Sequence, residues 1–333
     1  MLHLLFKIFT LDLSIFQQEF HNYKEAQSLE REPKNLYEPI SYILSLSGKK
    51  IRPVLTLMAA NIFSSNFKDA LPAAYAIEMF RNFTLVHDDI MDDAPLRRGK
   101  ETVHEKWDIN AGILSGDAML ILAYQYFENY PAATFQKLAK LFSKTAIEVC
   151  DGQQLDVDFE TRNDVTIKEY IKMISLKTSV LIGAALKMGA IVSDASESDA
   201  QKLYDFGLNL GIAFQLQDDF LDTFGNPETF GKQVGGDIIE NKKTYLYLKS
   251  LALASDKDYQ LLNNLYQSKL EDNTKKIELV KEIFNKYNIP TLMKEQIANY
   301  SEKAFAVLET MHISEKSKKE FLQFGKALMT RKV

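Results

Sequence analysis

The stretch LVHDDIMD at residues 85–92 decides the fold, because it places three aspartates at the end of a long apolar pattern with helical period. A second copy, LQDDFLD at residues 216–222, follows another apolar stretch. Residues four apart on a helix share one face, with Cβ atoms about 6 Å apart, so each copy aims two or three carboxylates in one direction. The two copies predict a helical protein with a repeated acidic site.

These carboxylates predict a metal site. Like charges crowded on one helix face repel each other, and a bound cation relieves the repulsion. Oxygen ligands without His or Cys favour Mg²⁺, which binds through one or two carboxylates and completes its shell with water and substrate phosphates. In a chain with 45 acidic residues, one such motif alone is more typical of a solvated helix face. The repeat and its apolar surroundings favour several Mg²⁺ ions that bridge to a diphosphate.

Composition narrows the class of protein. The 333 residues carry a net charge of −5 and no dense basic stripe, which argues against a nucleic-acid partner. The one cysteine, Cys150, excludes an intrachain disulfide and a cysteine-based zinc site. No run approaches the roughly 20 apolar residues of a membrane span, and no secretory signal is recognisable. We therefore expect no integral membrane segment and a cytoplasmic location.

The spacing of apolar residues predicts an all-α protein. Eight prolines and fourteen glycines leave long uninterrupted segments of period 3.6, and no segment alternates with period 2. We expect residues 1–12 to be a candidate disordered extension and residues 13–333 to form one domain, a bundle of about 10–13 long helices around a deep central cavity. The expected helices are 13–31, 36–47, 51–65, 69–93, 111–129, 133–159, 166–192, 197–224, 240–253, 257–267, 271–287, 289–312 and 314–330.

Basic residues lie where a diphosphate would need them. A helix start offers both backbone N–H groups and a favourable dipole to an anion, and cations surround one such start at residues 47–53. Singly, each basic residue is more typical of a solvated surface charge. Together, beside the acidic motifs, they indicate phosphate binding. The candidates are Lys49, Arg52, Arg97, Arg98, Lys177, Lys232 and Lys242.

In these motifs the chain resembles the head-to-tail trans-polyprenyl diphosphate synthases, which have the isoprenoid synthase type I fold. The resemblance rests on the two aspartate motifs in context, on RRG at residues 97–99, on GQQLD at residues 152–156, on Lys177-Thr178 and on Gly231-Lys232. It implies a Mg²⁺-dependent 1'-4 condensation of isopentenyl diphosphate with an allylic diphosphate (dimethylallyl, geranyl or farnesyl), through ionisation, condensation and proton elimination.

The resemblance also implies a role for each site residue. The metal ligands would be Asp88, Asp92 and Asp218, with Asp89, Asp219 and Asp222 in support. The allylic diphosphate would bind Arg97, Lys177, Lys232 and Lys242, and isopentenyl diphosphate would bind Lys49, Arg52 and Arg98. Thr178 and Gln215 would turn their dipoles toward the carbocation. Arg81 stands where the family commonly has His or Gln, and arginine can donate to the same phosphate.

By the same resemblance, product length depends on residues beneath the first motif. Phe83 and Phe80 are expected at the cavity floor, and Thr84 beside them is small. This pattern indicates a short-chain all-trans product, C20 (geranylgeranyl diphosphate) ahead of C15 (farnesyl diphosphate).

Two alternatives stay open. A class I terpene cyclase shares the helical bundle and one DDxxD motif, but a second aspartate-rich motif and cations for isopentenyl diphosphate argue against it. A noncatalytic partner subunit of a prenyl synthase would not need intact motifs. The family further implies a homodimer.

Overall fold

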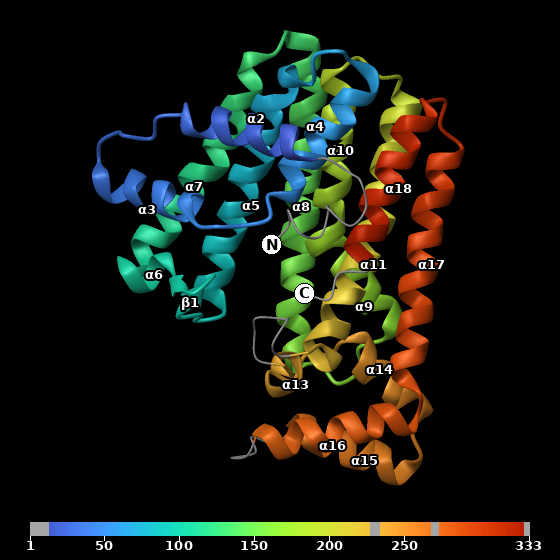
Figure 1. Ribbon diagram of the computed structural model, residues 1–333. Helices are drawn as coiled ribbons and strands as arrows, with labels where there is room; N and C mark the ends of the chain where they lie inside the picture. The colour runs from blue at the N-terminus through green and yellow to red at the C-terminus, as the bar shows by residue number, and fades with distance from the viewer. Residues whose placement is uncertain (1–12, 227–233, 268–272, 330–333) are drawn as a thin grey trace. The chain divides into compact units, whose positions relative to one another are not determined.

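The protein is all-α, as predicted (Figure 1). The computed structural model describes residues 13–226, 234–267 and 273–329. Residues 1–12, expected as an extension, lie outside the described residues. The strands within the described ranges are β1 (Leu96–Arg97) and β2 (Lys100–Glu101), which form one short antiparallel hairpin.

The chain forms two compact units. Unit 1 takes the described residues up to Lys144 together with Ala184–Tyr204, and unit 2 takes Thr145–Gly183 and the described residues from Asp205 onward. The expected single domain from residue 13 onward stays a prediction.

Unit 1 is built around α5 (Leu71–Met91), whose middle is buried on nearly every face. Figure 1 shows α5 beside α4 (Ile51–Phe63) and α7 (Ile109–Gln125), both of which it contacts. Small residues permit this approach, because a Cβ at Gly116 of α7 would lie 2.2 Å from Nε2 of His87. The acidic end of α5 is thus carried on a rigid core helix.

The other elements of unit 1 cover these three helices. They are α2 (Ser14–Glu25), α3 (Lys34–Ser45), η1 (Phe67–Ala70), α6 (Val103–Lys106), η2 (Tyr126–Asn129), the start of α8 (Ala132–Thr161), the end of α10 (Val180–Val192) and the start of α11 (Glu197–Phe224).

Unit 2 has its own apolar core, to which Leu246, Leu262, Val280 and Ile289 each contribute a fully buried side chain. Within it, α15 (Asp256–Gln267) and α16 (Asn273–Lys286) lie side by side (Figure 1). Besides the remaining parts of α8, α10 and α11, its elements are α9 (Ile167–Ile174), the π-helical η3 (Ser175–Ser179), α13 (Gly236–Ile239), α14 (Tyr245–Leu253), α15 (Asp256–Gln267), α16 (Asn273–Lys286), α17 (Ile289–Glu309) and α18 (Glu315–Met329).

Most predicted helices are confirmed, and the exceptions have local causes. The predicted start at Thr166 is a capping box with Glu169, and α11 has the predicted bounds. The predicted helix 13–31 was wrong at its end: α2 stops at Glu25, and farther along Ser28 Oγ accepts the Glu30 N–H, which offers the backbone a non-helical partner. The predicted helix 240–253 begins later, because Asn241 has a left-handed φ of 60°.

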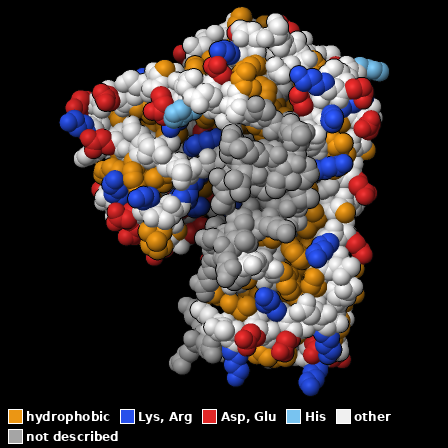
Figure 2. Space-filling view, viewed as in Figure 1, with side chains coloured by type: hydrophobic (Ala, Val, Ile, Leu, Met, Phe, Trp, Pro, Cys, Tyr) orange, Lys and Arg blue, Asp and Glu red, His pale blue; other side chains and the backbone are white. Residues whose placement is uncertain are grey.

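One helical stretch, Ile167–Val192, is long and apolar enough to cross a membrane by composition alone, but 72% of its most apolar window is buried inside the protein. Most of this stretch therefore packs inside the protein. On the face shown in Figure 2, Lys and Arg side chains are interspersed with Asp and Glu.

Candidate active site

The first carboxylate group lies at the C-terminal end of α5. Asp89 is 1% exposed, and its Oδ1 accepts hydrogen bonds from Nε (2.8 Å) and Nη2 of Arg97 on β1. The other oxygen, Oδ2, is buried and has no hydrogen-bond partner among the described residues. Asp88 is partly exposed, and Asp92, the residue after the helix, is exposed. Asp88 and Asp92 therefore meet solvent while Asp89 anchors Arg97.

A second contact lies within α5 and involves Arg81, which the sequence singled out. Nη1 of Arg81 lies 4.0 Å from Oδ2 of Asp88 and donates to Oγ1 of Thr84 at 2.9 Å. The Thr84 hydroxyl thus positions Arg81, a role that sequence reasoning did not foresee.

Cations gather where α5, the loop before α4 and the hairpin meet within unit 1. The Arg98 guanidinium lies against Gly48, where a Cβ would be 2.9 Å from Arg98 Cζ, and it donates to the Leu46 carbonyl at 3.2 Å. Lys50 pairs at 2.7 Å with Glu78, which is 4% exposed. Lys49 precedes the start of α4, and Arg52 lies in its first turn.

Three of these residues, Arg52, Arg81 and Arg98, form an arginine cluster in which guanidinium groups lie near one another. Burial, with the neighbouring Arg81 guanidinium, lowers the pKa of Arg52 to about 9. Burial also lowers the pKa of Arg81 and of Arg98. Nε of Arg52 is buried without a hydrogen-bond partner among the described residues. A bound anion would satisfy this donor and favour the charged guanidinium groups.

The second carboxylate group lies on α11 in unit 2. Asp219 is 6% exposed and accepts hydrogen bonds from the Tyr170 hydroxyl and from Nε2 of Gln215 at 2.9 Å. Oδ2 of Asp222 accepts the Asp237 N–H at 2.9 Å. Asp218 is partly exposed on the same helix. Asp219 is thus the buried member of this motif, as Asp89 is of the first.

The charges of this group fit a cation. Burial and the nearby Asp237 carboxylate raise the pKa of Asp219, and burial with Asp222 raises the pKa of Asp237. Carboxylates that resist ionisation because of burial and like charge gain stability from a hard cation. Together with the orphaned oxygen of Asp89, this makes both motifs chemically suited to divalent metal ions.

The π-helical η3 presents Lys177 and Thr178. A Cβ at Gly152 of α8 would lie 2.2 Å from the Lys177 backbone nitrogen, so glycine permits the close approach of α8 to η3. Nζ of Lys177 donates to Asp156 at 2.5 Å, and Thr178 donates to Gln215 Oε1 at 3.3 Å. The structure thus connects Thr178, Gln215 and Asp219 in one hydrogen-bonded series.

Two lysine candidates remain, Lys242 and Lys232, and the structure describes the first of them. Nζ of Lys242 lies 2.7 Å from Glu240 and 3.5 Å from Asp237, at the edge of the second carboxylate group. Lys232 lies outside the described residues.

The predicted chain-length residues lie on α5. The Phe80 ring is 1% exposed and packs edge-on against Phe142 at a centroid distance of 5.1 Å. The Phe83 ring is partly exposed, with its centroid 5.4 Å from Phe80 and 4.8 Å from the His87 ring. Phe80 is therefore a core residue, whereas Phe83 and Thr84 are both partly exposed.

Sequence reasoning missed three residues that shape the two groups. Tyr170 holds Asp219, Glu78 balances Lys50, and Asp237 adds a carboxylate beside Asp222. A charged residue inside the apolar run of α5 was the available signal for Glu78. Tyr170 gave no local signal, because its partner lies 49 positions away.

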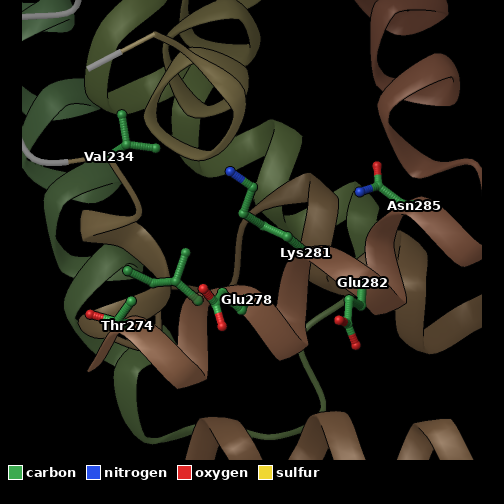
Figure 3. Close-up of a pocket in the computed structure, with 7 residues that line it drawn as sticks. Val234, Thr274, Glu278, Lys281, Glu282 and Asn285 are labelled. Atoms are coloured by element: carbon green, nitrogen blue, oxygen red, sulfur yellow. The ribbon is translucent and has the colours of Figure 1, made fainter. Parts of the chain in front are cut away.

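A separate cavity of about 510 Å³ runs along α16 and is lined by Val234, Thr274, Ile277, Glu278, Lys281, Glu282 and Asn285 (Figure 3). It contains none of the candidate site residues. Its mixed charge and open form indicate no particular ligand.

Comparison with known proteins decides the family. The polyprenyl synthetase family model matches residues 33–284. This chain belongs to the polyprenyl synthetase family. A geranylgeranyl diphosphate synthase of Saccharolobus solfataricus is 33% identical over 94% of this chain and 96% of its own length. A crystal structure of a geranylgeranyl pyrophosphate synthase is 50% identical and superposes with a TM-score of 0.92, over 97% of this chain and 99% of the other.

Family membership confirms the predicted class: the protein is a prenyltransferase of isoprenoid biosynthesis, and its fold is that of the polyprenyl synthases. The family uses divalent metal ions. A polyprenyl synthase from Caulobacter crescentus, 24% identical with a TM-score of 0.84 over 99% of this chain and 97% of its own, was crystallised with calcium and isoprenyl diphosphate.

Replacing Tyr170 with Phe should weaken the use of metal by the enzyme. The variant removes one donor to buried Asp219, so we expect prenyl transfer to need about 10–100-fold more Mg²⁺ for half-maximal rate, the range typical for loss of a residue that orients a metal ligand. The measurement is initial rate against Mg²⁺ concentration. Tyr247→Phe is the control, because the Tyr247 hydroxyl donates instead to Asn263. An unchanged Mg²⁺ requirement in Tyr170→Phe would contradict this role.

Proposed function

We propose that the protein condenses isopentenyl diphosphate head to tail with allylic diphosphates and releases geranylgeranyl diphosphate (C20). Two relatives at 33% and 50% identity over nearly the whole chain have this product in their names. The observation that carries the proposal is the arginine cluster beside a carboxylate group at the end of α5, since one binds an anion and the other a cation.

The arginine cluster is the proposed site of isopentenyl diphosphate. Nε of Arg52 is buried, Arg98 donates to the Leu46 carbonyl, and Arg81 lies 4.0 Å from Asp88. Lys49 adds a cation before α4, where the N-terminal N–H groups favour an anion. A diphosphate that enters this cluster would accept hydrogen bonds from the guanidinium groups and favour their charged form.

The allylic diphosphate is proposed to lie with the carboxylates of both motifs. Asp88, Asp92 and Asp218 would hold Mg²⁺, with Asp222 in support, and Asp89 and Asp219 would orient their neighbours through Arg97 and Tyr170. Bound Mg²⁺ supplies charge that stabilises the departing diphosphate. Arg97, Lys177, Lys232 and Lys242 are the proposed direct diphosphate contacts. The assignment of both motifs to one diphosphate rests on their repetition in the sequence and on family membership.

The remaining chemistry needs orientation more than acid or base groups. Ionisation of the allylic C–O bond leaves a carbocation, which the double bond of isopentenyl diphosphate attacks, and the released proton goes to the departing diphosphate. Thr178 donates to Gln215, so the Gln215 carbonyl is held in one orientation near Asp219. A fixed dipole of this kind stabilises a developing positive charge without rearranging during the reaction.

The two alternative functions, terpene cyclase and noncatalytic subunit, would give different results in a product assay. A terpene cyclase would release hydrocarbon without consuming isopentenyl diphosphate, and a noncatalytic subunit would show no turnover alone. Full-length similarity to synthases supports the condensation. As a soluble prenyl synthase, the protein is proposed to act in the cytoplasm.

The direct test is to incubate the purified protein with Mg²⁺, isopentenyl diphosphate and, separately, dimethylallyl, geranyl and farnesyl diphosphate, and to identify products by mass. We expect a C20 diphosphate, and we expect EDTA to abolish its formation because EDTA removes Mg²⁺. Asp88→Asn and Asp218→Asn should each reduce the rate by about 10²-fold or more, because each removes a charge that acts on the leaving group. Asp256→Asn, an exposed change at the start of α15, is the control. Hydrocarbon release or no turnover would reject the proposal.

Replacing Phe83 with Ala should lengthen the product. Phe83 is the partly exposed aromatic residue of the proposed floor, so its removal opens space for further isoprene units, and we expect C25 or longer diphosphates. The measurement is product length by mass spectrometry. Phe80→Leu is the control for general loosening of the core, because Phe80 is buried against Phe142. An unchanged product in Phe83→Ala would remove Phe83 from this role.

We also propose a homodimer that forms through α7. Its surface carries Ile109, Ile113, Leu114 and Ile121, all between 41% and 59% exposed, which is an unusual concentration of large apolar side chains on one helix. Ile113→Arg with Leu114→Glu should shift the mass measured by light scattering from dimer to monomer. A dimer that persists in this variant would exclude α7 as the interface.

A further inference from the structure

The hairpin after α5 brings together residues on either side of it. Asp93 follows the end of α5 with a left-handed φ of 47°. Leu96 pairs with Glu101 and Arg97 with Lys100, and the Thr102 N–H donates to the Pro95 carbonyl at 3.2 Å, which extends the pairing. The chain therefore returns to Asp93 just as the short helix α6 begins at Val103.

Three side chains with metal-binding atoms meet at this return. Asp93, His104 and Glu105 each offer one ligand atom, and these atoms all lie within 4.8 Å of one another. Nε2 of His104 is 3.7 Å from Oε1 of Glu105, beyond hydrogen-bonding distance. Asp93 and Glu105 are exposed, so an ion can reach the cluster from solvent.

His104 is the member that points to a ligand. Its side chain is 5% exposed, yet neither Nδ1 nor Nε2 has a hydrogen-bond partner among the described residues. Buried imidazole groups normally pair at least one nitrogen, because an unsatisfied buried polar group is unfavourable. A metal ion bound to one ring nitrogen would satisfy that atom and use the two carboxylates at the same time.

We propose that Asp93, His104 and Glu105 form a divalent-cation site that takes Zn²⁺, distinct from the two aspartate motifs. Imidazole nitrogen with carboxylate oxygen suits Zn²⁺, whereas Mg²⁺ prefers oxygen ligands alone. Ligand atoms about 2.0–2.2 Å from zinc in a tetrahedron lie about 3.4 Å apart, so the exposed carboxylates need only small rotations. Three protein ligands leave the fourth position to water.

Such an ion would tie the end of α5 to α6 across the base of the hairpin. The hairpin carries Arg97, which pairs with Asp89, and leads into Arg98, which packs on Gly48. The site would therefore stabilise the segment that presents both arginines. It touches neither side chain directly, so zinc binding can be tested apart from prenyl transfer.

The test is calorimetric titration of ZnCl₂ alone into the full-length protein in excess Mg²⁺, which occupies hard oxygen sites. We expect one equivalent of Zn²⁺ to bind with a dissociation constant in the micromolar range or below. Asp93→Asn and Glu105→Gln should each weaken this binding at least tenfold, and both residues are exposed, so neither change disturbs the core. Glu101→Gln makes the same charge change on the same hairpin and should bind as the unmodified protein does.

Two results would overturn the proposal. One is the absence of stoichiometric Zn²⁺ binding to the unmodified protein in excess Mg²⁺. The other is binding of unchanged strength in both Asp93→Asn and Glu105→Gln, which would place the ion at another site. Neither result bears on prenyl transfer, which the product assay tests separately.

Discussion

The carboxylates at the ends of α5 and α11 are held on one face by the helical repeat, so their repulsion cannot be relieved by moving a side chain elsewhere. In each motif one aspartate is buried and fixed, Asp89 by Arg97 and Asp219 by Tyr170 and Gln215. The other aspartates are closer to solvent. Burial and the nearby Asp237 carboxylate raise the pKa of Asp219, so its charged form is unfavourable in the protein alone. A bound metal ion would stabilise the charged carboxylates.

The arginine cluster shows the corresponding effect for positive charge. Burial lowers the pKa of Arg52, Arg81 and Arg98, so these groups are held charged at a cost that an anion would reduce. Close packing makes this arrangement possible, because Gly48 leaves room for the Arg98 guanidinium. Carboxylates suited to metal ions and arginines suited to phosphate together fit a metal diphosphate.

Features that depend on residues close together in the sequence could be predicted, and features that depend on distant residues could not. The long helices and the capping box at Thr166 follow from local periodicity and local hydrogen bonds, so the sequence predicted them. The hairpin was not foreseen, since it depends on left-handed backbone at Arg98 and Gly99 and on only two residues in each strand. Contacts such as Tyr170 with Asp219 join distant positions, and no pattern in a single sequence reports them. The roles predicted for individual site residues stay predictions.

The central claim is that both aspartate motifs and the arginine cluster serve one pair of diphosphates. The most direct measurement is a crystal structure of the protein with Mg²⁺, isopentenyl diphosphate and an unreactive thio-analogue of the allylic diphosphate. The account predicts Mg²⁺ ions on Asp88, Asp92 and Asp218 that share the allylic diphosphate, with isopentenyl diphosphate on Arg52, Arg81 and Arg98. An allylic diphosphate bound by one motif alone, or isopentenyl diphosphate bound away from the arginines, would contradict it.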